Sequence, residues 1–205
     1  MKDLFYYRNL PHWQPMAATF FVTTRLHGSL PMHIVKELKE QKAALLKAAN
    51  KDVGEEYKAQ KRYFALYDDA LDSNPNGPYY LSETKVAEIV KESLHYRDGK
   101  EFKLHAYCIM SNHIHFMATT YETNIAYLWK IMQYLKQYSG KEANKVLGRT
   151  GNPFWEEEYY DHLVRDEGEF YRIEKYILSN PVKAKLVEKA EDWAWSYSTV
   201  KPVPT

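Results

Sequence analysis

Alternating and β-branched apolar residues predict four strands along the chain. They cover about residues 17–26, 102–110, 113–119 and 159–164, which are rich in Val, Thr, Phe and Tyr. Residues i and i+2 of a strand point to the same face of a sheet. In the third strand, Ile114 is therefore expected to face a core, while the residues on either side of it face the other way.

Apolar residues that recur every three or four positions predict helices between and after these strands. Asp166 followed by Glu169 is an Asp variant of a capping box, which favours a helix start. Asn180-Pro181 is expected to end that helix, because the residue before a proline avoids the α region. Two helices are expected at about 32–50 and 52–70, and a third is expected to begin at Ser82. A fourth should begin at Thr123 or Asn124, and a fifth should run from Asp166 to about Ser179.

The order β-α-β-β-α-β indicates an α+β fold with a ferredoxin-like antiparallel sheet. We expect a single domain over residues 1–205, with a helical extension at about 31–75 inside the first crossover. A helix bearing Tyr176 would follow the last strand of the sheet, and residues 182–205 would form a C-terminal tail.

Composition adds few constraints to this picture. The formal net charge is +1 and the chain has 18 tyrosines, so a nucleic-acid surface would have to be local, and aromatic rings could stack on bases or pack a core. The single cysteine, Cys108, is expected to be a buried thiol. No apolar run approaches ~18 residues and no signal peptide is apparent, so we expect a cytoplasmic protein without a membrane span.

The segment His113-Ile114-His115 carries the most specific chemistry. Both imidazoles would project from one strand to the same face, where two converging ring nitrogens can begin a divalent metal site. A His-x-His pair is also common without any function, so the interpretation depends on what completes the site.

The last predicted helix offers a candidate. Arg172, Tyr176 and Asn180 are spaced by four and share one stripe beside its apolar seam. A tyrosine hydroxyl, with a reference pKa of ~10, is a weak nucleophile that a nearby divalent ion can assist. The alternative is that Tyr176 only packs the helix against the sheet.

Together these residues resemble the HUH-class single-tyrosine transposases, specifically the REP-associated tyrosine transposases. Met110-Ser111-Asn112-His113-Ile114-His115 is similar to that family's histidine motif, with Ser111 in place of the usual proline. Tyr176-Ile177-Leu178-Ser179-Asn180-Pro181 is similar to its tyrosine motif. Shorter similarities occur at Leu10–Trp13, Phe20–Leu26, Tyr80-Leu81 and Trp193–Ser196, in the order of the family, so the resemblance extends over about residues 8–198.

The resemblance implies a metal-dependent enzyme that nicks and rejoins DNA. His113 and His115 would bind Mg2+ or Mn2+, and Asn180 would stand where relatives place a glutamine that helps to hold the ion. Tyr176 would attack a phosphodiester of single-stranded or hairpin DNA from a repetitive extragenic palindromic (REP) element, giving a 5′-phosphotyrosine. The protein would act as a monomer or a homodimer.

Several other polar residues have two interpretations each. Arg172 and Lys175 beside the tyrosine, and Lys130 and Lys136 on the preceding helix, are candidate DNA contacts or parts of a solvated face. His105 is expected to share a strand face with Tyr107, with partial burial or an approach to the site as alternatives. His162 has the alternatives of a surface residue and a supplementary metal ligand. His12-Trp13 has the alternatives of a packing contact and a base-stacking pair.

Two further functions stay open on the sequence alone. A transposase-derived protein that binds DNA hairpins without cutting them would keep the same fold. A metal hydrolase of small phosphoesters would use the same two histidines without needing Tyr176.

Overall fold

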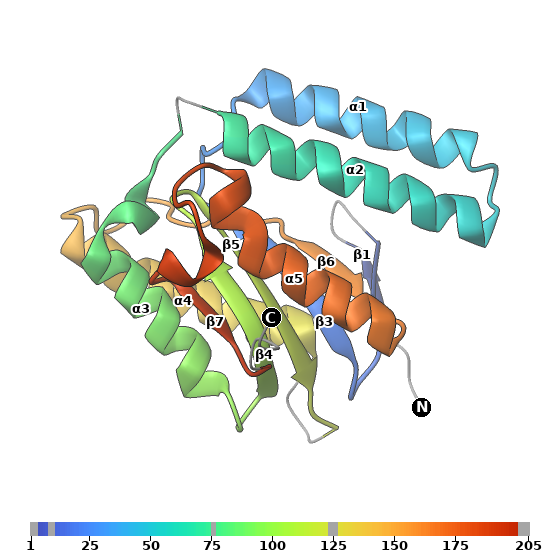
Figure 1. The fold of residues 1–205 in the computed structure, drawn as a ribbon. Helices are drawn as coiled ribbons and strands as arrows, with labels where there is room; N and C mark the ends of the chain where they lie inside the picture. The colour runs from blue at the N-terminus through green and yellow to red at the C-terminus, as the bar shows by residue number, and fades with distance from the viewer. Residues whose placement is uncertain (1–3, 8–10, 75–76, 123–126, 201–205) are drawn as a thin grey trace. The chain divides into compact units, whose positions relative to one another are not determined.

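The computed structural model describes residues 4–7, 11–74, 77–122 and 127–200, with side chains from residue 15 onward (Figure 1). The strands are β1 (Leu4–Tyr7), β2 (Pro11–Gln14), β3 (Thr19–Arg25), β4 (Phe102–Ile109), β5 (His113–Thr120), β6 (Tyr160–Leu163) and β7 (Ser196–Ser198). The helices are α1 (Met32–Ala48), α2 (Val53–Ser73), α3 (Thr84–Arg97), α4 (Leu128–Val146) and α5 (Glu167–Lys183), with short 3-10 turns η1 (Tyr80–Ser82) and η2 (Ala190–Asp192). The expected cap at Thr123 or Asn124 and the side chains of His12 and Trp13 lie outside this description.

The chain forms two compact units. Residues 28–78 make one of them, and residues 1–27 with 79–205 make the other. The first unit is an antiparallel pair of helices, α1 and α2, with a small core around Leu30, Leu38 and Leu71. It contains the helical extension that was predicted at about 31–75. Among the described residues, no helix combines the length and the apolar character needed to cross a lipid bilayer.

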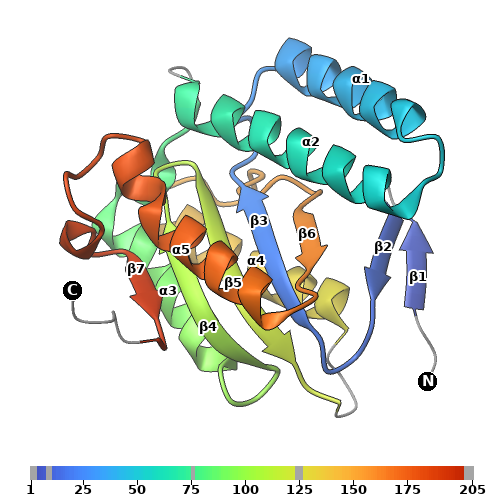
Figure 2. The same ribbon diagram turned by 45° about the vertical axis from the view of Figure 1, so that its right-hand side comes forward.

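The second unit is built on an antiparallel five-stranded sheet in the order β6-β3-β5-β4-β7. Four of these strands, with α3 and α4, follow the predicted order β-α-β-β-α-β, so the α+β fold is confirmed. Helices α3 and α4 cover one face of the sheet and α5 covers the other (Figure 2). Ile114 and Phe116 of β5 point into the core beneath α3 and α4, where both are fully buried.

Two parts of the N- and C-terminal regions differ from the sequence prediction. Pro11–Gln14 was not among the predicted strands, but it pairs with β1 in a separate two-stranded sheet. The tail contributes β7 to the main sheet, beside β4. Trp193 and Trp195 secure this edge, because Trp193 Nε1 donates to Ile109 O at 3.1 Å and Ile109 N donates to Trp195 O at 2.9 Å. Three residues without clear alternation gave too weak a signal for a strand.

The end of α5 was also placed too early. The helix passes through Asn180 and Pro181 and ends at Lys183. Proline removes only one N–H donor, and the tendency of the preceding residue to avoid the α region is a bias that this helix overcomes. The backbone continues with Ala184 N donating to Asn180 O at 2.8 Å, so the helix gains one further turn.

A β-bulge in β4 separates His105 from Tyr107, contrary to the expectation of a shared face. Leu104 pairs with Ala118 and Ala106 with Met117, which leaves His105 as the extra residue. A bulge shifts the alternation of the strand by one position. His105 therefore lies against Phe170 of α5, with ring centroids 4.9 Å apart, while Tyr107 contacts His95 of α3 on the other face.

Gly140 allows the segment before β6 to approach α4 closely. A Cβ at this position would lie 3.2 Å from Phe154 Cβ and 3.4 Å from Trp155 Cδ1. Residues Phe154 and Glu156 in turn bond to the end of β3, through His27 N to Phe154 O and Glu156 N to Arg25 O. The absence of a side chain at Gly140 thus allows this segment to pack closely against α4.

We expect Gly140→Leu to lower the free energy of unfolding by about 1–3 kcal/mol, the usual cost of overpacking a core. Urea unfolding followed by circular dichroism measures it. Gln137→Leu is the control, because Gln137 is exposed on the same helix. Equal unfolding midpoints for the two variants would contradict the packing role of Gly140.

Candidate metal and tyrosine site

The two histidines of β5 face α5, as the strand alternation predicts, and their rings converge. His113 Nε2 and His115 Nε2 lie 2.9 Å apart, and both residues are fully buried. Both rings therefore present the same nitrogen to one point. Two imidazoles in this arrangement are chelating groups, and imidazole is a common ligand of divalent transition-metal ions.

Each imidazole is held from behind by a side-chain oxygen. His115 Nδ1 lies 2.7 Å from Thr23 Oγ1, and His113 Nδ1 lies 2.6 Å from Asn112 Oδ1. Thr23 is the cross-strand partner of His115 on β3, while Asn112 belongs to the three-residue loop between β4 and β5. Partners of this kind fix the orientation of histidines that bind metal ions through the opposite ring nitrogen.

Helix α5 brings Tyr176 to these imidazoles. The Tyr176 ring lies 5.7 Å from the His115 ring and 5.9 Å from the Phe21 ring, both in edge-to-face geometry. Phe21 also stacks on His115 at 5.7 Å. The three rings form one aromatic cluster, which places the tyrosine beside the histidine pair.

The start of α5 is held by a buried carboxylate. Asp166 Oδ1 caps the helix by accepting from Glu169 N at 2.7 Å, as the capping-box pattern predicts. Glu169 accepts from His162 Nε2 at 3.1 Å and from Arg165 N at 3.0 Å. His162 is thus buried, which contradicts its interpretation as a surface residue. It anchors the tyrosine helix to β6.

Asn180 lies one turn beyond Tyr176 and is fully buried. Its Nδ2 donates to Tyr176 O at 2.9 Å. Among the described residues, its Oδ1 has no hydrogen-bond partner. A buried acceptor without a partner costs about 1–3 kcal/mol, so a cation or a water molecule at this oxygen would relieve a real penalty. Imidazole nitrogens and amide oxygens are both donor types that divalent ions accept in proteins.

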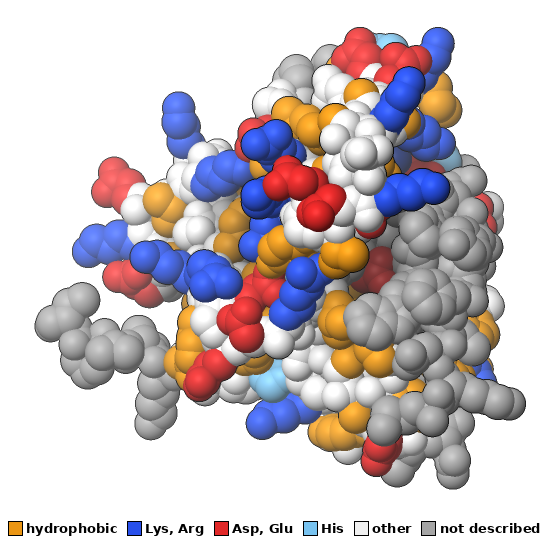
Figure 3. All heavy atoms as spheres, turned by 90° about the vertical axis from the view of Figure 1, so that its right-hand side faces the viewer, with side chains coloured by type: hydrophobic (Ala, Val, Ile, Leu, Met, Phe, Trp, Pro, Cys, Tyr) orange, Lys and Arg blue, Asp and Glu red, His pale blue; other side chains and the backbone are white. Residues whose placement is uncertain are grey.

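The candidate DNA contacts are divided between two faces of the sheet. Arg172 and Lys175 are exposed on α5, beside Tyr176. Lys130 and Lys136 lie on α4, on the face of the sheet that α5 does not cover. On the surface shown in Figure 3, positive and negative side chains are interspersed, in keeping with the net charge of +1.

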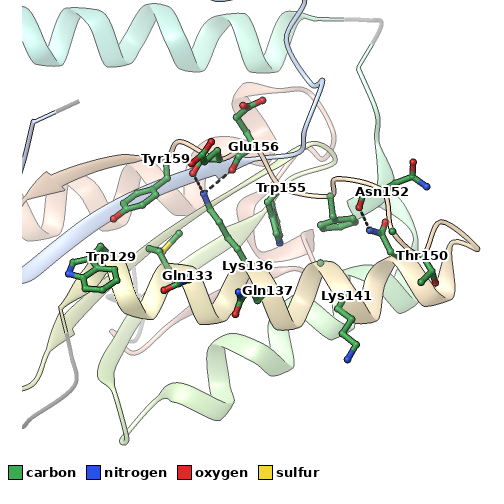
Figure 4. Close-up of a pocket in the computed structure, with 16 residues that line it drawn as sticks. Trp129, Gln133, Lys136, Gln137, Lys141, Thr150, Asn152, Trp155, Glu156 and Tyr159 are labelled. Carbon is green, nitrogen blue, oxygen red and sulfur yellow. Dashed lines mark hydrogen bonds between the residues drawn. The ribbon is translucent and has the colours of Figure 1, made fainter. Parts of the chain in front are cut away.

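Lys136 has an intramolecular role in a pocket of about 470 Å³ between α4 and the segment before β6 (Figure 4). Its Nζ donates to Glu156 O at 2.9 Å and to Glu157 O at 3.0 Å, and lies 4.9 Å from the Tyr159 ring centroid. A DNA phosphate would have to compete with these bonds, and such a contact by Lys136 stays a prediction.

Neither Thr23 nor Phe21 was singled out from the sequence, although both belong to a segment that resembles the family. The signal available was their alternation along β3, which places them on the same face. Their function depends on register, because only the pairing of Thr23 with His115 brings the hydroxyl to the ring nitrogen. Cys108, the partner of His115 on β4, is a buried thiol as expected.

Burial lowers the pKa of His105, with a further contribution from Lys103. The unfolded chain then binds a proton more readily than the folded protein, so the stability that neutral His105 provides is present above about pH 6.5 and is lost below it. We expect the free energy of unfolding to fall less for His105→Gln than for wild type when the pH is lowered from about 7.5 to about 5. Urea unfolding at both pH values tests this, and parallel losses would contradict it.

Comparison with known proteins identifies the same family that the motifs suggest. Residues 80–180 match the family model described as "Transposase IS200 like". A putative REP-associated tyrosine transposase of Haemophilus influenzae is 29% identical over 103 residues, which cover 46% of this chain and 58% of that protein. The match thus spans little more than half of the relative.

The fold has a solved counterpart. A structure described as a REP-associated tyrosine transposase bound to a REP hairpin superposes with a TM-score of 0.54 at 15% identity, over 94% of this chain and 82% of that one. At this identity the likeness supports the fold alone. The part of the chain that matches the IS200-like transposase model contains both the histidine pair and Tyr176, and the predicted resemblance to the REP-associated tyrosine transposases is confirmed.

Proposed function

We propose that this protein is a metal-dependent single-stranded DNA endonuclease and strand transferase that acts at hairpin-forming repeats. The observation that carries the proposal is the contact between Tyr176 and His115 inside a transposase-like domain. The similar solved protein, which is bound to a REP hairpin, supports hairpin DNA as the partner. Action as a monomer or a homodimer stays a prediction.

Tyr176 is the proposed nucleophile. Its hydroxyl oxygen would attack a DNA phosphorus and form a new P–O bond, while the bond to the 3′ oxygen breaks and that oxygen takes up a proton. The products are a 5′-phosphotyrosine and a free 3′-hydroxyl. The ester retains the energy of the phosphodiester, so a 3′-hydroxyl can attack it in turn and rejoin or transfer the strand.

His113, His115 and Asn180 are the proposed protein ligands of Mg2+ or Mn2+. When bound, the ion would polarise the phosphoryl group and stabilise the charge that develops on it. Hard ions of this kind prefer oxygen ligands, so two imidazoles are an unusual pair of ligands for them, and phosphate oxygens of the DNA would complete the coordination. Arg172 and Lys175, exposed on the same helix as Tyr176, are proposed to contact DNA phosphates beside the scissile bond, and Lys130 is a more remote candidate.

The decisive experiment incubates the protein with 5′- and 3′-labelled single-stranded hairpin oligonucleotides and Mn2+. An adduct that survives denaturing electrophoresis and carries the label 3′ of the cut is the expected result. Tight hairpin binding without any adduct would instead favour the transposase-derived binding protein. Turnover of a small phosphodiester that persists in Tyr176→Phe would favour the hydrolase.

A further inference from the structure

The pocket beside α4 lies on the opposite face of the sheet from α5 and Tyr176, and the proposed reaction does not use it. It has a volume of about 470 Å³ and lies between α4 and the segment before β6 (Figure 4). Its lining combines aromatic rings with carboxamide side chains. The rings include Trp129, Trp155 and Tyr159, and the carboxamides are Gln133, Gln137, Asn144 and Asn152.

The buried aromatic part of this lining is held in place by a hydrogen bond and by close packing. Trp155 Nε1 donates to Ser139 Oγ of α4 at 2.9 Å, and Ser139 Oγ donates to Leu135 O at 2.6 Å. Phe154 packs against Gly140, the next residue of α4. Ring faces that are fixed in this way can receive a flat ligand without a large ordering cost.

Asn144 supplies a hydrogen-bond acceptor to the lining. The residue is only 5% exposed, and its Nδ2 donates to Asn152 O at 2.7 Å. A carbonyl oxygen can only accept, so this bond fixes which end of the Asn144 amide is the oxygen. In the part of the chain that the structure describes, Asn144 Oδ1 has no hydrogen-bond partner. A buried acceptor in this state is unfavourable, so a ligand that brings an N–H donor to Asn144 would be favoured.

The charged residues of the lining are balanced. They are Lys136, Lys141, Glu156 and Glu157, so their formal charges sum to zero. Lys136 Nζ is bonded to the backbone carbonyl groups of both glutamates, and the Glu156 carboxylate lies 3.2 Å from Arg25 Nη2. Lys141 is exposed. The pocket therefore suits an uncharged group, and an anionic part of the same ligand would lie outside it, near Lys141.

We propose that this pocket binds a single unpaired nucleobase of the DNA hairpin on which the protein acts. A nucleobase is flat, uncharged and carries N–H donors on its edge, so it matches the rings, the balanced charge and Asn144 Oδ1. A base inside a duplex uses its faces in the stack and its edge in pairing, so only a base from a loop, a bulge or a single-stranded flank can enter. The inference rests on the proposed function, because it takes hairpin DNA as the substrate.

Removal of bases one at a time tests the proposal. The probe is a fluorescein-labelled REP hairpin oligonucleotide in which each unpaired nucleotide is replaced in turn by an abasic one. We expect one abasic position to weaken binding to the full chain by about 5–100-fold, the range typical for loss of one stacked base. Fluorescence anisotropy without divalent metal ions measures the affinity while no strand is cut. Equal affinity for all the abasic hairpins would overturn the proposal.

Two variants connect the sensitive position to the pocket. Gln137→Trp places an indole at the exposed rim, and Asn144→Leu removes the acceptor at similar volume. In both variants the loss of affinity caused by the abasic nucleotide should disappear, because the base can no longer bind in the pocket. Gln137→Trp decides the test if Asn144→Leu does not fold, since Gln137 is exposed.

Tyr138→Trp is the matched control, because Tyr138 is exposed on the same helix but lies outside the lining of the pocket. It should keep the full sensitivity to the abasic nucleotide. If Gln137→Trp keeps this sensitivity to the same degree as Tyr138→Trp, the base binds elsewhere and the proposal is wrong.

A free nucleotide could bring the same chemistry to the pocket, so dAMP, dCMP, dGMP and dTMP are titrated separately while tryptophan fluorescence is recorded. Binding that Gln137→Trp abolishes, together with equal affinity for all the abasic hairpins, would assign the pocket to free nucleotides and overturn the proposal. Failure of the proposed function gives a different result. The abasic effect and its loss in Gln137→Trp would then persist, although no Tyr176 adduct forms.

Discussion

Tyr176→Phe is expected to abolish the covalent DNA adduct and to reduce strand cleavage by at least about 1,000-fold, because the variant lacks the oxygen that would attack phosphorus. The phenyl ring keeps the contacts with Phe21 and His115, so the fold and hairpin binding should be retained. Adduct yield on denaturing gels and hairpin affinity by fluorescence anisotropy measure the two effects separately.

Tyr171→Phe is the matched control for this variant. Tyr171 lies on the same helix but is exposed, and its hydroxyl contacts Glu167 at the helix surface. It should form adducts as wild type does. Equal adduct yields from Tyr176→Phe and wild type would remove Tyr176 from the reaction and leave the histidine pair without its proposed nucleophile.

His115→Gln is expected to weaken Mn2+ binding by more than about 100-fold. Loss of a residue that only hydrogen-bonds to a metal ligand typically weakens binding by about 10–100-fold, and this substitution removes a proposed ligand itself. The rate of DNA cleavage should fall together with the Mn2+ affinity. A change of pH within the range where wild type is active should not restore it. Isothermal titration with Mn2+ and cleavage rates at saturating DNA provide the two measurements.

His105→Gln tests whether this loss is specific. His105 also lies on the α5 side of the sheet, but it contacts Thr119 and Phe170 at the other end of the strands. Its substitution should leave Mn2+ affinity unchanged. If both variants lost Mn2+ to the same degree, a general disturbance beneath α5 would explain the result, and the His113–His115 pair would not be the metal site.

The local parts of the site could be predicted because each depends on a short-range rule. Alternation along a strand places His113 and His115 on one face and Ile114 on the other, whatever the neighbouring strands are. The Asp166–Glu169 pattern starts α5 in the same local way. The order of the motifs added the resemblance to the REP-associated tyrosine transposases, which the comparisons confirm.

Other features depend on pairing between distant segments and had no local signal. A single bulged residue moved His105 away from Tyr107, and the sequence around it gives no mark of the bulge. The short strand β7 forms only because β4 offers it an edge. His162 was ambiguous until α5 placed Glu169 beside it.

The sequence by itself determined the four central strands, the main helices, their order and the residues with chemical capacity, because periodicity, capping and motif spacing are properties of neighbouring positions. The tertiary structure alone decided that the two Nε2 atoms lie 2.9 Å apart, that Tyr176 contacts His115, and that Thr23 and Asn112 support the rings. These facts follow from strand register and from the packing of α5 on the sheet. The contacts of His115 with Thr23 and with Tyr176 join residues more than 50 positions apart, which no pattern of neighbouring residues can predict.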